Sequence, residues 1–386
     1  MLKGESFRSE EKDRSKNQGI ARQSNIELLR ILAMFFIIMH HYVTHGTTNF
    51  VYLDPPLSVQ NVFALFLGGF GRPAMAIFIL ICGYFSIKSE FKLPRFVSLI
   101  AQVFSYSVIL MLLAKFILPG GSEIGRDDLF ASIFPTALGT YWFFTAYVVL
   151  ILLSPYINKL LLKLTQKQHK ALIVLFVAIW CILPTIMDAK LSGSDLAYFV
   201  TLYSIAAYIR LYPLKTNASR HFALFGFWAF IILASIASSS YLLNYSGVFR
   251  KYITFFTEYN KLPGAMCALE LFLAMVQMKP FYSKWINGIA STSFGIYLIH
   301  DNFLIRPFLW GTIFNSAAYV GTSLYFVHFF VSVMIIFVCC AIIDTLFWKL
   351  SLSKVVKRLL DQYLEKAIIQ MKSLYSVVER FFVKFI

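Results

Sequence analysis

Long apolar runs separated by short polar segments follow one another along most of this 386-residue chain. A helix that crosses a membrane needs about 20 mostly apolar residues, and helices satisfy their own backbone hydrogen bonds within lipid. The pattern therefore predicts an all-α, polytopic integral membrane protein of about ten transmembrane helices. The predicted spans are 26–45, 65–87, 96–118, 140–160, 170–187, 196–213, 221–242, 250–277, 288–312 and 325–349.

The eighth of these runs is the least regular. Glu258, Asn260, Lys261 and Pro263 interrupt it. If this polar cluster prevents a full crossing, the number of spans becomes odd and the chain would end on the opposite side of the membrane.

Composition and charge agree with a membrane domain. The chain is 59% hydrophobic and only 14% charged, whereas soluble domains carry roughly 25% charged residues. The net charge of +16 does not indicate a nucleic-acid partner, because the basic residues cluster in alternate segments between the apolar runs. With the N-terminus inside, the cytoplasmic segments hold 26 Lys and Arg and the outer loops hold 4. The positive-inside rule then predicts a multi-pass protein of the cell membrane with both termini cytoplasmic.

Three segments are distinguished along the chain. Residues 1–24 are polar with mixed charge, which is typical of disorder, and residues 25–350 form the transmembrane domain. In residues 351–386, apolar positions recur at spacings of three and four, and Lys and Arg occupy much of the other face. This pattern predicts a basic amphipathic helix on the inner membrane face; a partner-binding coiled coil is the alternative.

The first span carries ionisable residues at both ends. Such residues are costly within a membrane and mark functional sites by default. Arg30 and His41 are eleven residues apart, which is close to three helical turns, so they share a face with an axial separation of roughly 16 Å. Glu27 lies three residues before Arg30, on the same side of the helix. His40 points about 100° away from His41. A snorkelling arginine and an interfacial histidine are the alternative interpretation.

Four stretches in order resemble the acyltransferase 3 family of membrane O-acyltransferases. The first is the Asn25–Tyr42 segment with its arginine and histidine eleven apart, and the second is the arginine-led Gly71–Phe85 segment. The third is the aromatic Tyr141–Phe144 segment, and the fourth is Ser293–Asn302, which contains a Gly-x-Tyr-x-x-His sequence. Cys82 replaces the serine that is usual in the second stretch.

The resemblance implies transfer of an acyl group, usually acetyl from acetyl-CoA, to a hydroxyl of a cell-surface or exported polysaccharide. The acceptor could be a capsule, an exopolysaccharide or a cell-wall polymer. Histidine has a pKa suited to removing a proton from a hydroxyl at neutral pH, so His41 is the candidate base, with His40 as the alternative. Arg30 is the candidate for binding the coenzyme's phosphates, because its planar group can hold phosphate through two parallel bonds.

Three further residues are candidates for the acceptor side. Arg72 could hold the acceptor or stabilise a developing oxyanion, or it could form a structural salt bridge with Glu258 or Glu270. His300 and Asp301 could orient the base or contact the acceptor; an interhelical hydrogen bond is the alternative for His300. The remaining histidines are interpreted as loop, interface or packing residues: His45, His169, His221 and His328.

Other functions fit less of the pattern. A transporter or flippase for lipid-linked sugars or small solutes would also have many spans and buried charges, but there is no inverted repeat and no pair of broken helices. A glycan polymerase would be expected to carry a large outer loop. The five cysteines lie in apolar runs without metal-ligand spacing, so no metal is predicted.

Overall fold

A computed structural model describes residues 23–47, 57–188 and 194–363. The described residues form helices and connecting turns, with no strand among them. Seven helical segments are long and apolar enough to cross a membrane. The prediction of an all-α polytopic membrane protein is confirmed. The seven segments are Ser24–Thr47, Val59–Ser86, Leu93–Phe116, Trp142–Lys163, Gln166–Met187, Ala218–Leu242 and Tyr325–Tyr363.

These segments are built from ten α-helices and three π-helical stretches. The first comprises α2 (Ser24–His41) and η1 (Tyr42–Thr47), and the second comprises α4 (Val59–Gly69) and α5 (Gly71–Ser86), which meet at Phe70. The remaining parts are α6 (Leu93–Phe116), α8 (Trp142–Lys163), α9 (Gln166–Val177), η3 (Ala178–Ile182), α10 (Leu183–Met187), α12 (Ala218–Leu242), α17 (Tyr325–Asp344), η8 (Thr345–Leu352) and a last helical stretch over 353–363.

The run 196–213 forms one continuous helix, α11 (Ser194–Leu211). Two other predicted runs take a more broken form. In the run 250–277, short 3-10 turns end at Thr257, just before the interrupting polar cluster, and a regular helix begins only with α13 (Leu262–Gln277). The run 288–312 is divided into α14 (Lys284–Ala290), α15 (Ser293–His300), α16 (Ile305–Phe308) and the π-helical η6 (Leu309–Ile313). The total of ten spans therefore stays a prediction.

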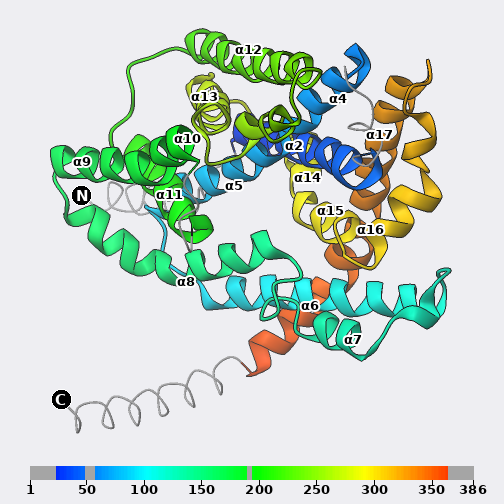
Figure 1. Ribbon diagram of the computed structural model, residues 1–386. Coiled ribbons are helices and arrows are strands. Elements are labelled where there is room, and N and C mark those ends of the chain that lie inside the picture. The colour runs from blue at the N-terminus through cyan, green and yellow to red at the C-terminus, as the bar shows by residue number, and fades with distance from the viewer. Residues whose placement is uncertain (1–22, 48–56, 189–193, 364–386) are drawn as a thin grey trace, which may run out of the picture.

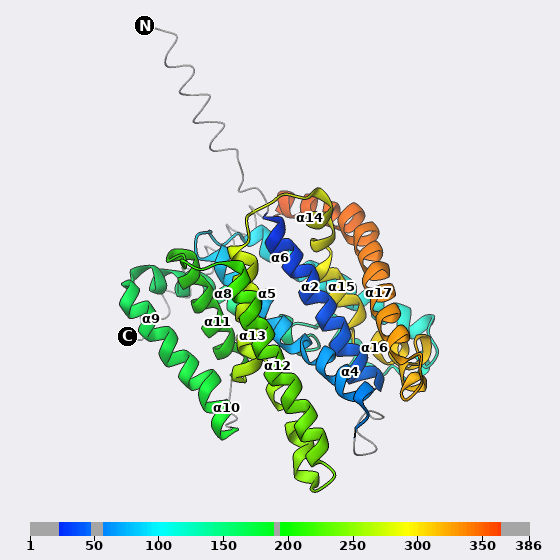
Figure 2. The same ribbon diagram turned by 90° about the horizontal axis from the view of Figure 1, so that it is seen from above.

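Helix α2 lies at the centre of the bundle. It packs against α4, α5 and α13 on one side and against α14, α15 and α17 on the other, an arrangement that is clearest when the bundle is seen from above (Figure 2). The α6 and α8 helices, with the short α7 (Arg126–Ile133), lie along another edge, and α12 lies at the opposite edge (Figure 1). The central position explains why α2 can bring side chains to several neighbours at once.

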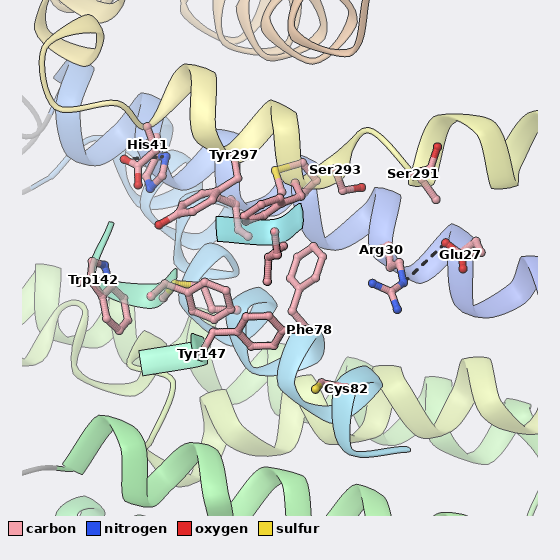
Figure 3. A pocket seen from close by; sticks show the side chains of 18 residues that line it. Glu27, Arg30, His41, Phe78, Cys82, Trp142, Tyr147, Ser291, Ser293 and Tyr297 are labelled. Atoms are coloured by element: carbon pink, nitrogen blue, oxygen red, sulfur yellow. Dashed lines mark ion pairs between the residues drawn. The ribbon is translucent and has the colours of Figure 1, made fainter. Parts of the chain in front are cut away.

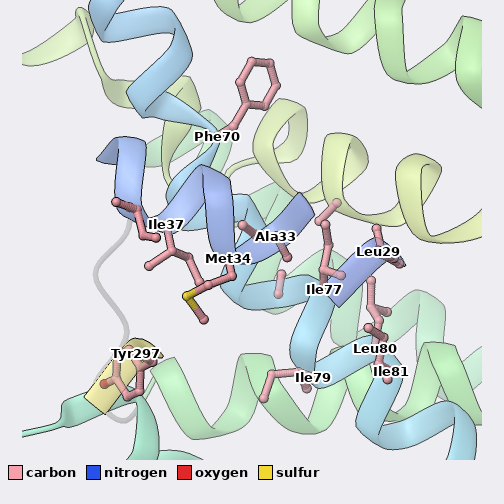
Figure 4. Packing of buried hydrophobic residues seen from close by; sticks show 14 of the residues in the cluster. Leu29, Ala33, Met34, Ile37, Phe70, Ile77, Ile79, Leu80, Ile81 and Tyr297 are labelled. Atoms are coloured by element: carbon pink, nitrogen blue, oxygen red, sulfur yellow. The ribbon is translucent and has the colours of Figure 1, made fainter. Parts of the chain in front are cut away.

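The interior is apolar on the faces between helices. Leu29, Ala33 and Ile37 of α2 are buried against Ile77 and Leu80 of α5 (Figure 4). The helices approach closely where a residue has no side chain: a Cβ added at Gly83 of α5 would lie 2.6 Å from the backbone oxygen of Tyr203 in α11. In membranes, apolar side chains gain little by leaving lipid for a helix contact. Helices there associate through close packing, which small residues allow.

The periphery is apolar as well. Large side chains such as Phe116, Ile186 and Trp285 are about four-fifths exposed, at 77%, 77% and 80%. Exposed apolar surface of this kind is unfavourable in water but matches a lipid environment.

The structure describes only part of the two terminal segments for which predictions were made. The proposed disordered segment lies outside the described residues except for its last two positions, of which Ser24 is buried and begins α2. The proposed amphipathic C-terminal helix is helical over 353–363, and its remainder lies outside the described residues.

Candidate active site

Arg30 and His41 line the same cavity. We call it the donor cavity, after the coenzyme-binding role expected for Arg30. It has a volume of about 340 Å³ and lies between α2, α5, α8 and α15, with further lining residues from α6 and the α14–α15 turn. Arg30 lies at one end, with its Nε 3.6 Å from Oε2 of Glu27, and His41 lies at the other end (Figure 3). The helical spacing predicted a shared face, and the structure has one because α2 is a continuous α-helix from Ser24 to His41.

The wall of the donor cavity between these ends is mostly apolar and aromatic. Met34, Phe78, Phe143 and Phe294 contribute to it, and so does Cys82 near the Arg30 end (Figure 3). Such a channel suits an extended, flexible and largely uncharged group with an anionic head at its arginine end.

The hydrogen bonds of His300 indicate which nitrogen of His41 carries a proton. His300 Nδ1 lies 2.6 Å from the backbone oxygen of Ile296, which can only accept. A neutral His300 therefore donates through Nδ1 and accepts at Nε2, which lies 3.0 Å from His41 Nδ1. His41 must then donate through Nδ1, and its Nε2 keeps a free lone pair. This is the tautomer that a general base requires.

Asp301 supports the same orientation. Its Oδ1 lies 3.6 Å from His41 Nδ1 and 3.1 Å from Arg306 Nη1. The carboxylate thus faces the protonated side of His41 and would stabilise the imidazolium that forms when the base takes up a proton. His300 and Asp301 are both more than 90% buried, so water screens these interactions little.

A second cavity meets the donor cavity at His41. This outer cavity, as we name it, has a volume of about 440 Å³, and it shares His41, Trp142 and Asp301 with the donor cavity. Arg72 lines the outer cavity and forms an ion pair with Glu258, one of the two salt-bridge partners considered for it. The other candidate partner, Glu270, instead pairs with His221 at 2.6 Å. His41 therefore lies where two separate approaches converge.

His40 is oriented differently from His41. Its Nδ1 lies 3.0 Å from the backbone oxygen of Gly68, and it lines the outer cavity but not the donor cavity. The 100° offset on the helix accounts for this separation.

His41, His45 and Asp301 offer three potential metal ligands within 4.8 Å of one another. Arg306 already occupies this space, with Nη1 3.4 Å from His45 Nε2 as well as 3.1 Å from Asp301. A cation bound here would have to displace the guanidinium group, so the cluster fits a metal poorly. His45 and Arg306 were not predicted as site residues. The π-helical turn after His41 places His45 beside the site, and the end of α15 at His300 lets the following residues place Arg306 there.

The helix is interrupted after His300, and side chains from two of the motif stretches stabilise this interruption by hydrogen bonds. The amide nitrogen of Asn302 donates to the hydroxyl of Tyr141 at 2.8 Å, and that hydroxyl donates to the backbone oxygen of Leu298 at 2.9 Å. Asn302 also accepts from the backbone nitrogen of Leu304 at 3.0 Å. Irregular backbone at membrane depth requires such internal partners, and here they fix His300 and Asp301 in place.

A helical membrane bundle with a part-buried histidine between two cavities is an arrangement that suits a membrane-embedded enzyme. Comparison with family models identifies it further: the acyltransferase 3 model, described as an acyltransferase domain, matches residues 23–345. The chain belongs to this family and is a membrane acyltransferase. No curated relative and no solved structure matches the chain.

Proposed function

We propose that the protein transfers an acyl group, acetyl from acetyl-CoA, to a hydroxyl of a cell-surface or exported polysaccharide. The observation that carries this proposal is the position of His41 at the junction of two cavities, one leading from Arg30 and one bordered by Arg72. Transfer between a coenzyme on one side of a membrane and a glycan on the other requires two approaches to one base.

The donor is assigned to the cavity with Arg30. The phosphates of acetyl-CoA would bind the guanidinium group, which can form two parallel hydrogen bonds to phosphate. The pantetheine arm would then lie along the apolar wall, with its thioester close to His41. The axial distance of roughly 16 Å between the two residues suits an extended arm of this kind.

The acceptor is assigned to the outer cavity. Trp142 and Tyr259 stack there with ring centroids 6.2 Å apart, and Tyr259 donates to the Asp195 carboxylate. Together with the Arg72–Glu258 pair, this gives a mixed aromatic and polar surface, which is suited to sugar rings and their hydroxyls. The lone pair on His41 Nε2 would take the proton of the attacking hydroxyl.

The reaction divides into two steps. The acceptor oxygen bonds to the thioester carbon as His41 accepts its proton, giving a tetrahedral intermediate with a negatively charged oxygen. The carbon–sulfur bond then breaks, and the imidazolium returns the proton to the departing thiolate. The products are an ester and free coenzyme A.

Consumption of the thioester by the purified protein tests the proposal. We expect acetyl-CoA to be converted to free coenzyme A in the presence of glycan acceptors and one acetyl ester to form for each thiol released. A transporter or flippase would move its solute without consuming thioester. Transport without thiol release would therefore overturn the proposal.

A further inference from the structure

The hydroxyl of Tyr297 is a buried polar group with no partner. Tyr297 is 6% exposed, and its hydroxyl oxygen has no hydrogen-bond partner among the described residues. The side chain lines the donor cavity together with His41 and Asp301. Buried polar groups are nearly always paired, so an unpaired one that borders a cavity is a candidate for contacting a molecule bound there.

Aromatic packing fixes the ring of Tyr297. Its centroid lies 5.7 Å from that of Tyr141, 6.1 Å from that of Phe143 and 6.4 Å from that of Phe294. Tyr141 is itself held by the hydrogen bonds that brace the broken backbone. The ring therefore cannot rotate without disturbing this aromatic cluster. The Tyr297 hydroxyl is thus oriented before any ligand binds.

The direction of the hydroxyl is toward the reacting region. Tyr297 of α15 lies one helical turn before Asp301, which caps the end of that helix, so the two residues share a face. In the close view of the cavity, the oxygen of Tyr297 points to the space between His41 and Trp142 (Figure 3). These two residues line both cavities, and the acyl carbon must reach this space to meet an acceptor.

We propose that the Tyr297 hydroxyl donates a hydrogen bond to the thioester carbonyl oxygen and stabilises the negative charge that develops there during acyl transfer. This inference rests on the proposed function. As the acceptor oxygen bonds to the carbon, the carbonyl π electrons move onto the oxygen, and Tyr297 holds that oxyanion while keeping its own proton. When the carbon–sulfur bond breaks, the carbonyl re-forms and Tyr297 returns to its starting state.

The other charged candidates are already engaged. Arg72 lines only the outer cavity and pairs with Glu258, and Arg306 pairs with Asp301. Asp301 itself would repel an oxyanion. Tyr297 instead offers a neutral donor whose hydrogen bond is free in the described structure, and such a preorganised donor is what oxyanion stabilisation requires.

Replacing Tyr297 by Phe removes one oxygen and keeps the ring. We expect kcat to fall about 100- to 1000-fold, the usual loss for one oxyanion donor, with the donor KM changed less than about threefold. Tyr325→Phe is the matched control, because Tyr325 is fully buried and lines neither cavity. Equal losses in the two variants, or a loss confined to KM, would overturn the proposal.

A spectroscopic measurement separates this hydrogen bond from a packing effect. Acetyl-CoA labelled with ¹³C at the carbonyl is bound to His41→Ala protein, which retains the thioester, and its carbonyl stretch is recorded by difference infrared spectroscopy. We expect the band to move to higher frequency when Tyr297→Phe is added. An unchanged band overturns the role of Tyr297, even if wild-type protein transfers acetyl groups. A shifted band in a protein that transfers none would support Tyr297 as a thioester ligand and overturn the proposed function.

Discussion

At the scale of single residues, the proton on His41 Nδ1 is the feature on which base catalysis depends. His300 fixes that proton by accepting at Nε2 while its own Nδ1 bonds to the backbone of Ile296. Such a partner controls tautomer and ring orientation without touching the substrate, so His300 is a positioning residue.

His300→Gln and His300→Phe distinguish this role from simple packing. The amide oxygen of Gln can still accept from His41 Nδ1, whereas Phe cannot. We expect kcat to fall about 10²- to 10⁴-fold for Phe, as for loss of a general base, and less than about tenfold for Gln. Thermal unfolding in detergent serves as the control for folding. Equal losses in the two folded variants would contradict the assignment.

Arg30→Lys tests the donor assignment. Lysine keeps the charge but lacks the planar fork that binds phosphate through two bonds. We therefore expect the apparent KM for acetyl-CoA to rise by about tenfold or more, since one lost charge-assisted hydrogen bond is worth about 1.5–3 kcal/mol, with the KM for the acceptor nearly unchanged. Equal effects on both KM values would indicate a structural role for Arg30.

Part of this site could be predicted from sequence, and the rest depends on tertiary packing. The shared face of Arg30 and His41 follows from helical geometry alone. The unpaired hydroxyl of Tyr297 could not be predicted, because pairing is defined only once neighbours are in place. His45 lies four residues after His41, which is a helical spacing, but its proximity to Arg306 requires a contact across 261 residues of chain.

At the scale of elements, α2 and the broken helical segment near residue 300 determine the site together. Sequence predicted a continuous span over 288–312, because apolar content is high throughout. The structure has a break there that Tyr141 and Asn302 stabilise. A break of this kind is not visible in hydropathy, since it depends on a partner from another helix.

Gly83→Ala probes the close approach of α5 and α11. An added Cβ would lie 2.6 Å from the backbone oxygen of Tyr203, so the helices would have to separate. We expect a loss of about 1–3 kcal/mol, as for overpacking in a core, measured as a lower unfolding temperature in detergent. Gly226→Ala in α12 is the control, because nothing lies within 4 Å of its added Cβ, and we expect no destabilisation. Similar shifts in both variants would contradict the packing account.

At the scale of the whole molecule, orientation decides whether the two cavities serve opposite sides of the membrane. Hydropathy predicted the class of fold, and the distribution of Lys and Arg predicted a cytoplasmic N-terminus. The broken runs limit what hydropathy can establish, because the predicted spans 250–277 and 288–312 do not form single long helices.

Cysteine accessibility in intact cells tests this orientation. Thr165→Cys is expected to resist an impermeant thiol reagent, because 165 lies in a predicted cytoplasmic segment. Ser122→Cys and Tyr245→Cys are expected to react. All three positions are exposed, and the five native cysteines are measured in the wild-type protein as background. Labelling at 165 from outside would reverse the orientation and remove the donor-side assignment of Arg30.

The central claim, that His41 drives acyl transfer onto a surface glycan, is tested most directly by mass spectrometry of surface glycans. Cells producing wild-type protein, His41→Ala or His40→Ala at equal membrane levels are compared for alkali-labile acetyl groups. We expect these groups in cells with wild-type protein, at least a 100-fold loss with His41→Ala as the general base is removed, and a smaller loss with His40→Ala. Full acetylation with His41→Ala, or loss only with His40→Ala, would contradict the account.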